Sequence, residues 1–430
     1  MKAARIGYFI WFILLFLIFL RPFISEHAFL RAGILYVSSL IFFSFLYLVY
    51  FRGQIITLPR LRIWPALFIA TILFSIIIVG STPWSLLELY FFVPNILIFY
   101  IASEIKPYQQ KQLFACILFS ACIISTYAIY QYFIGMLHAE RYLTCVEDSG
   151  LIEKVLKGRR VFGTFVSPNV FASYILTMLF VGIGYLSLVK KRRKVFYSIA
   201  VVLMALSLFY TKSIGGLLTG VVTFLIFTCC VGSQANFRKR KIILVCFSII
   251  LLLVIIASIY RFLPTERLSQ FLNFNDPNNS IIQRTYYWQA SIDMIKDRPF
   301  FGIGWRQFGL LYELYKSPEA NISHYSHNVF LQILAELGPI GLASFILLVA
   351  VFLRDGIRVI QGDGEEKAMK IALFFAGCAF LIHNIVDLSF YFGQVAFFWW
   401  MILGLLSNYS AKDNRHVNSR NINRRTISGV

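Results

Sequence analysis

Long apolar stretches alternate with shorter polar ones along most of this chain. Each apolar stretch holds roughly 18–23 residues, which as a helix is enough to cross a bilayer core of about 30 Å. No small-residue cleavage site follows the first stretch, so we interpret it as an anchor and not as a removed signal peptide. The pattern predicts an all-α polytopic membrane protein with about twelve transmembrane helices, near residues 6–24, 32–51, 63–80, 84–102, 112–134, 168–189, 195–210, 214–231, 242–260, 329–352, 369–390 and 394–409.

Two polar segments, 135–167 and 261–328, are much longer than the other connections. Loops of such length are usually functional or contain secondary structure of their own. We therefore predict a single integral membrane domain over residues 1–410, with both long loops on the periplasmic side. The polar, basic segment 411–430 is predicted to be a disordered cytoplasmic tail.

The larger loop contains a predicted helix that begins at Ser280 and ends near Asp297, before Pro299. Ser280 and Gln283 have the spacing of a capping box. An apolar stripe at helical spacing follows, formed by Ile281, Trp288, Ile292 and Ile295. The larger loop is accordingly predicted to be partly helical.

Composition agrees with a membrane protein, and charge sets its expected orientation. The chain is 59% hydrophobic, against about 45–50% in soluble proteins. The predicted cytoplasmic loops and tails hold 24 of the 40 Lys and Arg residues, and the short loops on the other side hold 3. This asymmetry follows the positive-inside rule, with both termini cytoplasmic. The net charge of +20 is thus interpreted as topology signals and not as a nucleic-acid surface.

Several charged residues are candidates for binding an anion at the periplasmic mouth of the bundle. Arg284 lies on the same predicted helical face as Ile281 and Trp288, and Arg159 and Arg160 precede a helix start at Ser167. Lys212 lies in a very short periplasmic turn. Taken singly, such residues are often snorkelling side chains or lipid-headgroup contacts.

Two histidines, His324 and His327, are further candidate site residues at the same end of the bundle. His324 and His327 are three residues apart, which would place them on one face of a helix starting there. A lone interfacial histidine is more often structural than catalytic. Together with Arg160, Lys212 and Arg284, however, His327 favours a polyanionic, lipid-linked substrate such as a lipid diphosphate. Histidine titrates near neutral pH, so His327 is a candidate general base.

Other signatures of catalysis are absent from the sequence: there is no Walker loop, no G-x-S-x-G and no convincing metal-ligand spacing. His383 and Asp387 are four residues apart within the predicted helix 369–390. A buried structural pair is the favoured interpretation, and a proton relay is the alternative. Glu88 and Glu336 are similar intramembrane acids that are expected to face inward and pair.

The sequence resembles the O-antigen ligase family, part of the ligase, polymerase and oligosaccharyltransferase superfamily of bacterial envelope glycan assembly. The family motif is His, then Asn, Ser or Gln, nine residues, Gly, two residues, and Gly, Thr or Val. Here His327, Asn328, Gly338 and Gly341 match it completely. The stretches "RVFGTFVSPNVFASYI" and "MIKDRPFFGIGWRQF" resemble two further blocks of the family. One departure is Ser213-Ile214-Gly215, where members often carry Ser-Arg-Gly; Lys212, two residues before Ile214, is the candidate to supply the missing charge.

The resemblance implies a metal-independent, inverting glycosyltransferase without a cofactor. Its donor would be a glycan on undecaprenyl diphosphate, and its acceptor a sugar hydroxyl such as one on lipid A–core. The implied catalytic residues are His327, Arg284 and Arg160, and the candidate substrate-binding residues are Lys212, Arg159, Arg306 and Asn328. Two alternatives stay open: a polymerase of the same superfamily, and a membrane transporter, which would concentrate its essential groups at the midplane.

Overall fold

The structure is a computed structural model that describes residues 2–26, 29–52, 63–138, 158–233, 273–276, 279–362 and 366–427. All regular secondary structure in these ranges is helical. The long helices are α1 (Lys2–Leu20), α2 (Leu30–Arg52), α3 (Ile63–Ile78), α4 (Pro83–Ala102), α5 (Pro107–Tyr130), α8 (Pro168–Tyr185), α9 (Lys191–Tyr210), α10 (Ile214–Ser233), α13 (Ser280–Asp297), α14 (Phe308–Tyr315), α15 (Val329–Gln361), α16 (Lys367–His383) and α17 (Gly393–Ile427). Short helical turns are η1 (Arg21–Phe23), η3 (Gln131–Gly135) and η4 (Ser389–Tyr391).

Seven helices in the described part of the chain are long and apolar enough to cross a membrane: α1, α2, α4, α5, α8, α9 and α15. The helices α3 and α10 are apolar but shorter. The chain is therefore a multi-pass membrane protein that is all-helical in the described ranges. The count of twelve spans stays a prediction, and the predicted span 242–260 lies outside the described residues.

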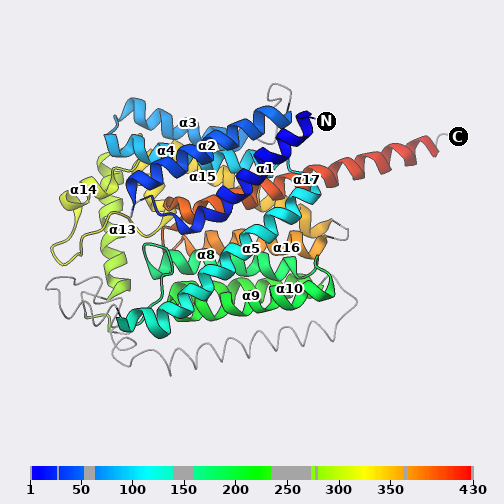
Figure 1. Ribbon diagram of the computed structural model, residues 1–430. Helices are drawn as coiled ribbons and strands as arrows, with labels where there is room; N and C mark the ends of the chain where they lie inside the picture. Colours follow the sequence, from blue (N-terminus) through cyan, green and yellow to red (C-terminus); the bar gives the residue numbers. More distant parts are fainter. Residues whose placement is uncertain are drawn as a thin grey trace.

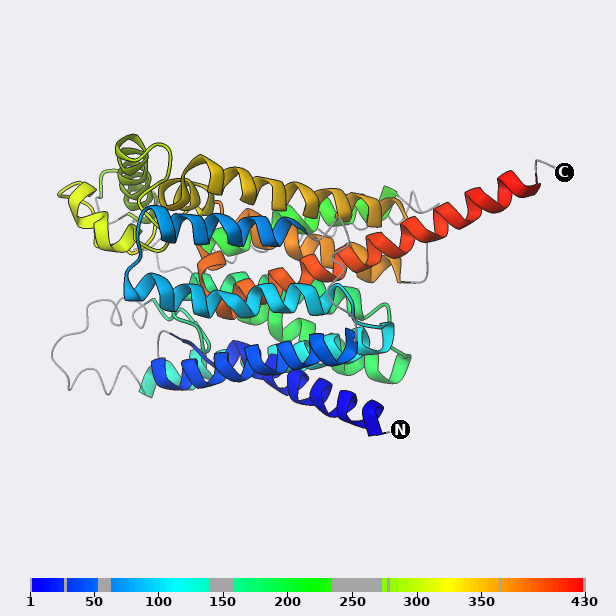
Figure 2. The ribbon, with the colours of Figure 1, turned by 90° about the horizontal axis from the view of Figure 1, so that it is seen from above.

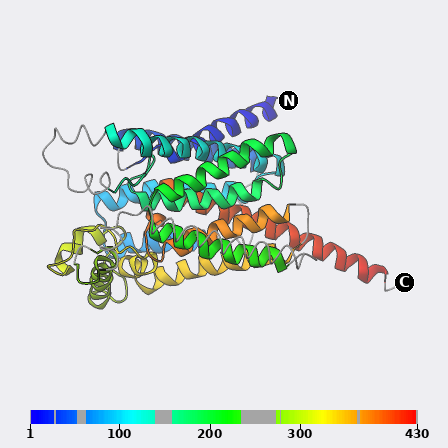
Figure 3. The ribbon, with the colours of Figure 1, turned by 90° about the horizontal axis from the view of Figure 1, so that it is seen from below.

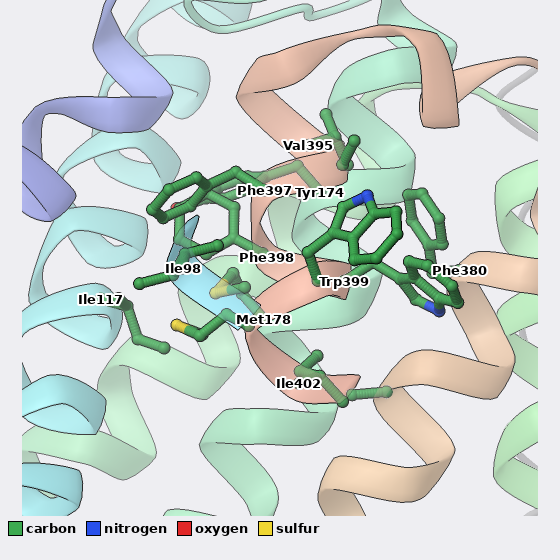
Figure 4. Packing of buried hydrophobic residues seen from close by; sticks show 14 of the residues in the cluster. Ile98, Ile117, Tyr174, Met178, Phe380, Val395, Phe397, Phe398, Trp399 and Ile402 are labelled. Atoms are coloured by element: carbon green, nitrogen blue, oxygen red, sulfur yellow. The ribbon is translucent and has the colours of Figure 1, made fainter. Parts of the chain in front are cut away.

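The core of the bundle is built around the first half of α17. Every hydrophobic side chain from Val395 to Leu406 is buried, and a helix that is apolar on all sides is expected at the centre of a fold. Aromatic rings join it to its neighbours, with Trp399 lying 5.8 Å from Phe380 of α16 and Phe398 lying 5.3 Å from Tyr174 of α8. Figure 4 shows Phe398 beside Tyr174 and Trp399 beside Phe380.

The two predictions for the C-terminal region are corrected by the structure. The predicted helix 369–390 ends at His383, because a loop and η4 occupy the stretch before α17. The predicted disordered tail is helical as far as Ile427, as the continuation of α17. Figure 1 shows this half of α17 projecting beyond the bundle.

The two ends of the bundle differ. The N- and C-termini lie at the same end, and α13 and α14 lie at the opposite end (Figure 1). The bundle helices run lengthwise in this view, whereas α13 runs across their ends. Figures 2 and 3 show α13 nearly end-on, which agrees with that crossing. The larger loop is thus partly helical, as the sequence predicts, and α13 forms a strap across what we call the α13 end of the bundle.

Candidate functional site

The start of α15 holds His327 in the loop just outside the helix. Asn328 is the N-cap, and its side-chain oxygen accepts hydrogen bonds from the backbone N–H groups of Phe330 (3.0 Å) and Leu331 (3.1 Å). His327 has a φ of +55°, a left-handed conformation that is uncommon for residues other than glycine. Because the helix starts at Val329, His324 and His327 do not share a helical face, contrary to the prediction.

The ring of His327 is held by two neighbours from other elements. Its Nδ1 lies 3.4 Å from Oδ1 of Asp387, and its centroid lies 5.4 Å from the ring of Tyr287 on α13. The His327 side chain is 31% exposed, whereas that of Asp387 is 7% exposed. The carboxylate contact occupies Nδ1, so Nε2 is the nitrogen that can meet a substrate.

Asp387 lies in the loop between α16 and η4, and a backbone hydrogen bond brings this loop to His327. The N–H of Val329 donates to the carbonyl oxygen of Asn384 at 3.0 Å. The Asn384 side chain in turn accepts from the N–H of Phe390 at 2.7 Å, which fixes the shape of the loop. Asp387 was predicted inside a helix, and its true place beside the motif histidine is what sequence reasoning missed.

The carboxyl of Asp387 is surrounded by hydrogen-bond donors and positive charge. His383 Nδ1 lies 3.7 Å from Oδ2, and the hydroxyl of Ser389 donates to the same oxygen at 3.4 Å. Burial would by itself raise the pKa of Asp387, but the hydrogen bond from His327 and the neighbouring positive charges lower that pKa to about 2. The group is therefore a carboxylate throughout the neutral pH range.

Arg284 reaches from α13 to the same loop. Its Nε donates to the carbonyl oxygen of Val386 at 2.9 Å, and its Nη1 donates to that of Ser280 at 3.0 Å. Val386 immediately precedes Asp387, so the guanidinium lies beside the His327–Asp387 pair. Both acceptors are neutral carbonyl groups, so neither neutralises the charge of the guanidinium.

The local structure of α13 differs from the sequence prediction in two respects. The N-cap is Asn279, whose side chain accepts from the N–H of Ile281 at 2.8 Å, so Ser280 does not form the capping box. The buried face is formed by Gln283, Tyr287, Ala290, Ser291 and Met294, and the predicted stripe of Ile281, Trp288, Ile292 and Ile295 is more exposed.

A second group of cations surrounds the start of α8. Arg160 donates from Nε to the carbonyl oxygen of Thr211 (3.1 Å) and from Nη2 to Oδ1 of Asn169 (2.9 Å). Lys212 donates to the carbonyl oxygen of Gly158 at 2.9 Å. The N-cap of α8 is Ser167, as predicted from the sequence. Arg159 follows Gly158 and is exposed.

The two groups meet at Val386. A Cβ atom on Gly215, in the first turn of α10, would stand 3.5 Å from a Val386 methyl group, which is ordinary contact distance. The turn at Lys212 leads directly into this helix. Arg160, Lys212, Arg284 and His327 are thus gathered around one part of the α13 end, from four separate stretches of sequence.

Arg306 has a different environment. It is 7% exposed, pairs with the buried carboxylate of Glu88 on α4, and donates to the carbonyl oxygen of Tyr391 at 2.6 Å. This geometry fits a buried structural ion pair better than the substrate-binding role expected from the sequence. Asn328 is likewise occupied as a helix cap. Glu336, the other acid singled out above, accepts hydrogen bonds from Gln332 (2.8 Å) and Tyr391 (3.0 Å).

The motif residue Gly338 and the following Pro339 create a docking point behind the site. Gly338 has φ +67° and ψ −170°, which breaks the helical geometry inside α15. Proline has no N–H, so the carbonyl of Ala335 lacks its usual helical partner. It accepts instead from the N–H of Ile303 (2.8 Å), and the carbonyl of Glu336 accepts from Gly304 (2.9 Å). The loop that follows α13 is thereby fixed to α15.

In the described ranges, no group of three or more His, Cys, Asp or Glu side chains is arranged to hold a metal ion. The His327–Asp387 pair, with Arg284, Arg160 and Lys212, therefore forms the candidate site at the α13 end.

These features define a multi-pass helical membrane protein with a cationic, histidine-bearing site at one end of its bundle. A family model described as O-antigen ligase matches residues 199–346, which include α13, the loop that follows α13 and the whole His327 motif. This match supports a place in the O-antigen ligase family, whose members are membrane glycosyltransferase-like enzymes of polysaccharide biosynthesis. No curated protein matches the chain.

Proposed function

We propose that this protein transfers a glycan from undecaprenyl diphosphate to a sugar hydroxyl, with lipid A–core as the acceptor. The observation that carries the proposal is the position of His327. Its ring is partly exposed, its Nδ1 faces a buried carboxylate, and Arg284 binds the peptide next to that carboxylate.

His327 acts as the general base in this proposal. The acceptor oxygen forms a bond to the anomeric carbon of the donor as the bond from that carbon to the diphosphate oxygen breaks. The hydroxyl proton passes to Nε2 of His327, and attack from the face opposite the leaving group inverts the anomeric configuration. Asp387 orients the ring through Nδ1 and stabilises the imidazolium that forms, as carboxylates do in catalytic triads.

The cationic side chains bind the leaving diphosphate and stabilise its negative charge. Arg284 donates at present to two neutral carbonyl oxygens, and phosphate oxygens are stronger acceptors for a guanidinium. Arg160 donates to Thr211, next to Lys212, in the turn that leads into α10, whose Gly215 adjoins Val386. In this proposal both cations contact the same anion, with the exposed Arg159 at the edge. Lys212 would supply the charge that an arginine gives in other members, without the planar fork of that residue.

The charge asymmetry of the loops supports a site on the periplasmic face of the bacterial inner membrane, with both termini in the cytoplasm. The termini lie together at the end opposite α13 (Figure 1), which agrees with this topology. Cysteine-accessibility labelling tests it: residues 191 and 313 should react from opposite sides of the membrane. Labelling of both from one side would overturn the topology and the periplasmic site.

The gathering of essential groups at one end of the bundle favours transfer chemistry over transport, because transporters place their substrate sites near the midplane. An assay with purified protein, a defined lipid-diphosphate glycan and two acceptors decides the reaction. Transfer to lipid A–core supports the ligase, extension of the donor glycan alone would make the protein a polymerase, and absence of both products would refute glycosyl transfer. Added chelator should leave the rate unchanged.

A further inference from the structure

The loop between α13 and α14 presents two phenylalanines to the surroundings of the bundle. Phe300 is 73% exposed and Phe301 is 46% exposed, although a soluble loop seldom leaves two adjacent aromatic rings in water. We call these two residues the Phe300–Phe301 wedge. The backbone on both sides of the wedge is fixed. Before it, the N–H of Arg298 donates to the carbonyl oxygen of Met294 (3.0 Å), and after it the N–H of Ile303 donates to that of Ala335 on α15 (2.8 Å).

The position of the wedge follows from its contacts with two apolar helices. The ring of Phe301 lies 6.0 Å from that of Phe74 on α3. The carbonyl of Phe300 lies against Gly338 on α15, where an added Cβ would stand 2.9 Å from the carbonyl carbon. The helices α3 and α15 pack together, with Thr71 Oγ1 lying 3.3 Å from Ser344 Oγ. The wedge therefore lies beside the last turns of α3 and beside the break at Gly338 inside α15.

Both helices present apolar side chains outward at this level. On α3, Phe74, Ile77 and Ile78 are 42%, 77% and 52% exposed, and Ile340 on α15 is 52% exposed. Such residues on a multi-pass protein face acyl chains. Through the contact of Phe301 with Phe74, the wedge adjoins this apolar surface.

The helix α3 is too short to cover the full thickness of the bilayer core, so apolar surface beyond its end extends its coverage. Its 16 residues rise about 24 Å, less than the roughly 30 Å of a bilayer core. Beyond its end, Gln307 donates to the carbonyl oxygen of Gly80 at 3.1 Å, so the α13–α14 loop covers the backbone just where the helix stops. Figure 2 shows α14 beyond the end of α3. Two further exposed side chains of α14, Leu310 (57%) and Leu314 (78%), add apolar surface in this region.

We propose that the Phe300–Phe301 wedge inserts into the leaflet at the α13 end and contacts its acyl chains, and so holds the α13 strap at the membrane surface. The partner is the bilayer itself, and the proposal does not depend on the reaction catalysed. Because the same loop is fixed to α15 through the docking point, insertion of the wedge sets the depth of α13 and of Arg284 relative to the lipid headgroups.

Spin-label accessibility in lipid nanodiscs tests this directly. Single cysteines replace Phe300, Ile77 and Lys296 in a cysteine-free background, and relaxation by oxygen is compared with relaxation by a water-soluble nickel chelate. Ile77 serves as the acyl-chain reference, and Lys296 as the aqueous reference on α13, since its side chain is 66% exposed and paired with Asp293. The labels at 300 and 77 should both be relaxed more by oxygen, and the label at 296 more by nickel.

Two results would overturn the proposal. A label at 300 that behaves like the label at 296 would place the wedge in water. A label shielded from both reagents would mean that protein covers it. Since the readout is spectroscopic, the wedge can fail this test while glycosyl transfer stands, and the reverse also holds. Replacement of both phenylalanines by serine should shift a label at Lys296 further toward the aqueous phase, while Ile322→Ser, which removes an equally exposed side chain outside the wedge, should not.

Discussion

Gly338→Ala should weaken the attachment to α15 of the loop that follows α13, the helix that carries Arg284. Gly338 has φ +67° and ψ −170°, a combination that only glycine adopts readily. An alanine Cβ there would overlap the carbonyl oxygen of Phe300 and stand 2.9 Å from its carbon. Backbone atoms cannot rotate away as a side chain can, so the loop after α13 must leave its place on α15.

The magnitude follows from two contributions. Backbone strain at such a position costs about 1–3 kcal/mol. The hydrogen bonds from Ile303 and Gly304 to α15, once lost, cost about 0.5–1.5 kcal/mol each. The free energy of unfolding should therefore fall by roughly 2–6 kcal/mol. Alternatively, the docking point should open locally, and donor binding should weaken because Arg284 is no longer held near Val386.

Denaturant unfolding of the purified protein and donor binding by titration measure these two outcomes. Gly135→Ala is the matched control, because a Cβ there meets only side-chain atoms at 3.7 Å or more. If Gly338→Ala unfolds at the wild-type denaturant concentration and binds donor with wild-type affinity, the docking point has no such role.

Three further changes test individual parts of the account. Arg284→Lys should weaken donor binding about 10- to 100-fold in a titration while the protein still folds, because lysine cannot replace two guanidinium contacts; the same change at the exposed Arg298 should be mild, and equal effects would remove the special role of Arg284. Asp387→Asn should lower kcat about 100-fold or more with little change in donor affinity. The pKa of the Asp387 carboxyl is lowered to about 2, so its contribution to the stability of the fold is complete above the ordinary pKa of 3.8 and is lost as the pH falls through about 2. Activity that is lost between pH 5 and 7 therefore cannot come from protonation of Asp387. Glu88→Gln should lower the free energy of unfolding by about 3–5 kcal/mol because it leaves Arg306 buried without its partner, and Glu88→Leu combined with Arg306→Met should recover most of that loss; an unchanged single variant would show that the pair is not structural.

The features that sequence predicts well are those set by local chemistry. Apolar runs give the helices because length and hydrophobicity decide membrane insertion residue by residue. Ser167 is recognisable as an N-cap for the same reason. The motif at His327 is recognisable from spacing alone, and the placement of Arg160, Lys212 and Arg284 at one end follows from counting membrane crossings.

What sequence missed depends on contacts between distant segments. The stretch from Ile385 to Phe390 is largely apolar, so nothing local marks the end of α16 at His383. The loop forms because Asn384 bonds to the starts of α15 and η4, and those partners are invisible along the chain. Asp387 was therefore predicted inside a helix, when it is the carboxylate behind the candidate base.

The face of α13 shows the same limit. Gln283 is buried because its side chain donates to the carbonyl of Glu319 and accepts from the N–H of Asn321, so a polar residue lies on the packed face. A pattern that counts only apolar residues selects the wrong stripe. The partners of Gln283 come from the loop after α14, nearly forty residues further along the chain.

Turnover by His327→Ala tests the central claim most directly. Purified wild type, His327→Ala and His324→Ala are each supplied with a lipid-diphosphate glycan and a sugar acceptor, and initial rates and donor affinity are measured separately. His327→Ala should lose about 100-fold or more in rate while keeping most of its donor affinity, since a general base acts in the chemical step. His324→Ala, changed at an exposed position outside the motif, should stay close to wild type. A His327→Ala protein with the wild-type rate, or one that only fails to bind donor, would contradict the assignment of His327 as the base.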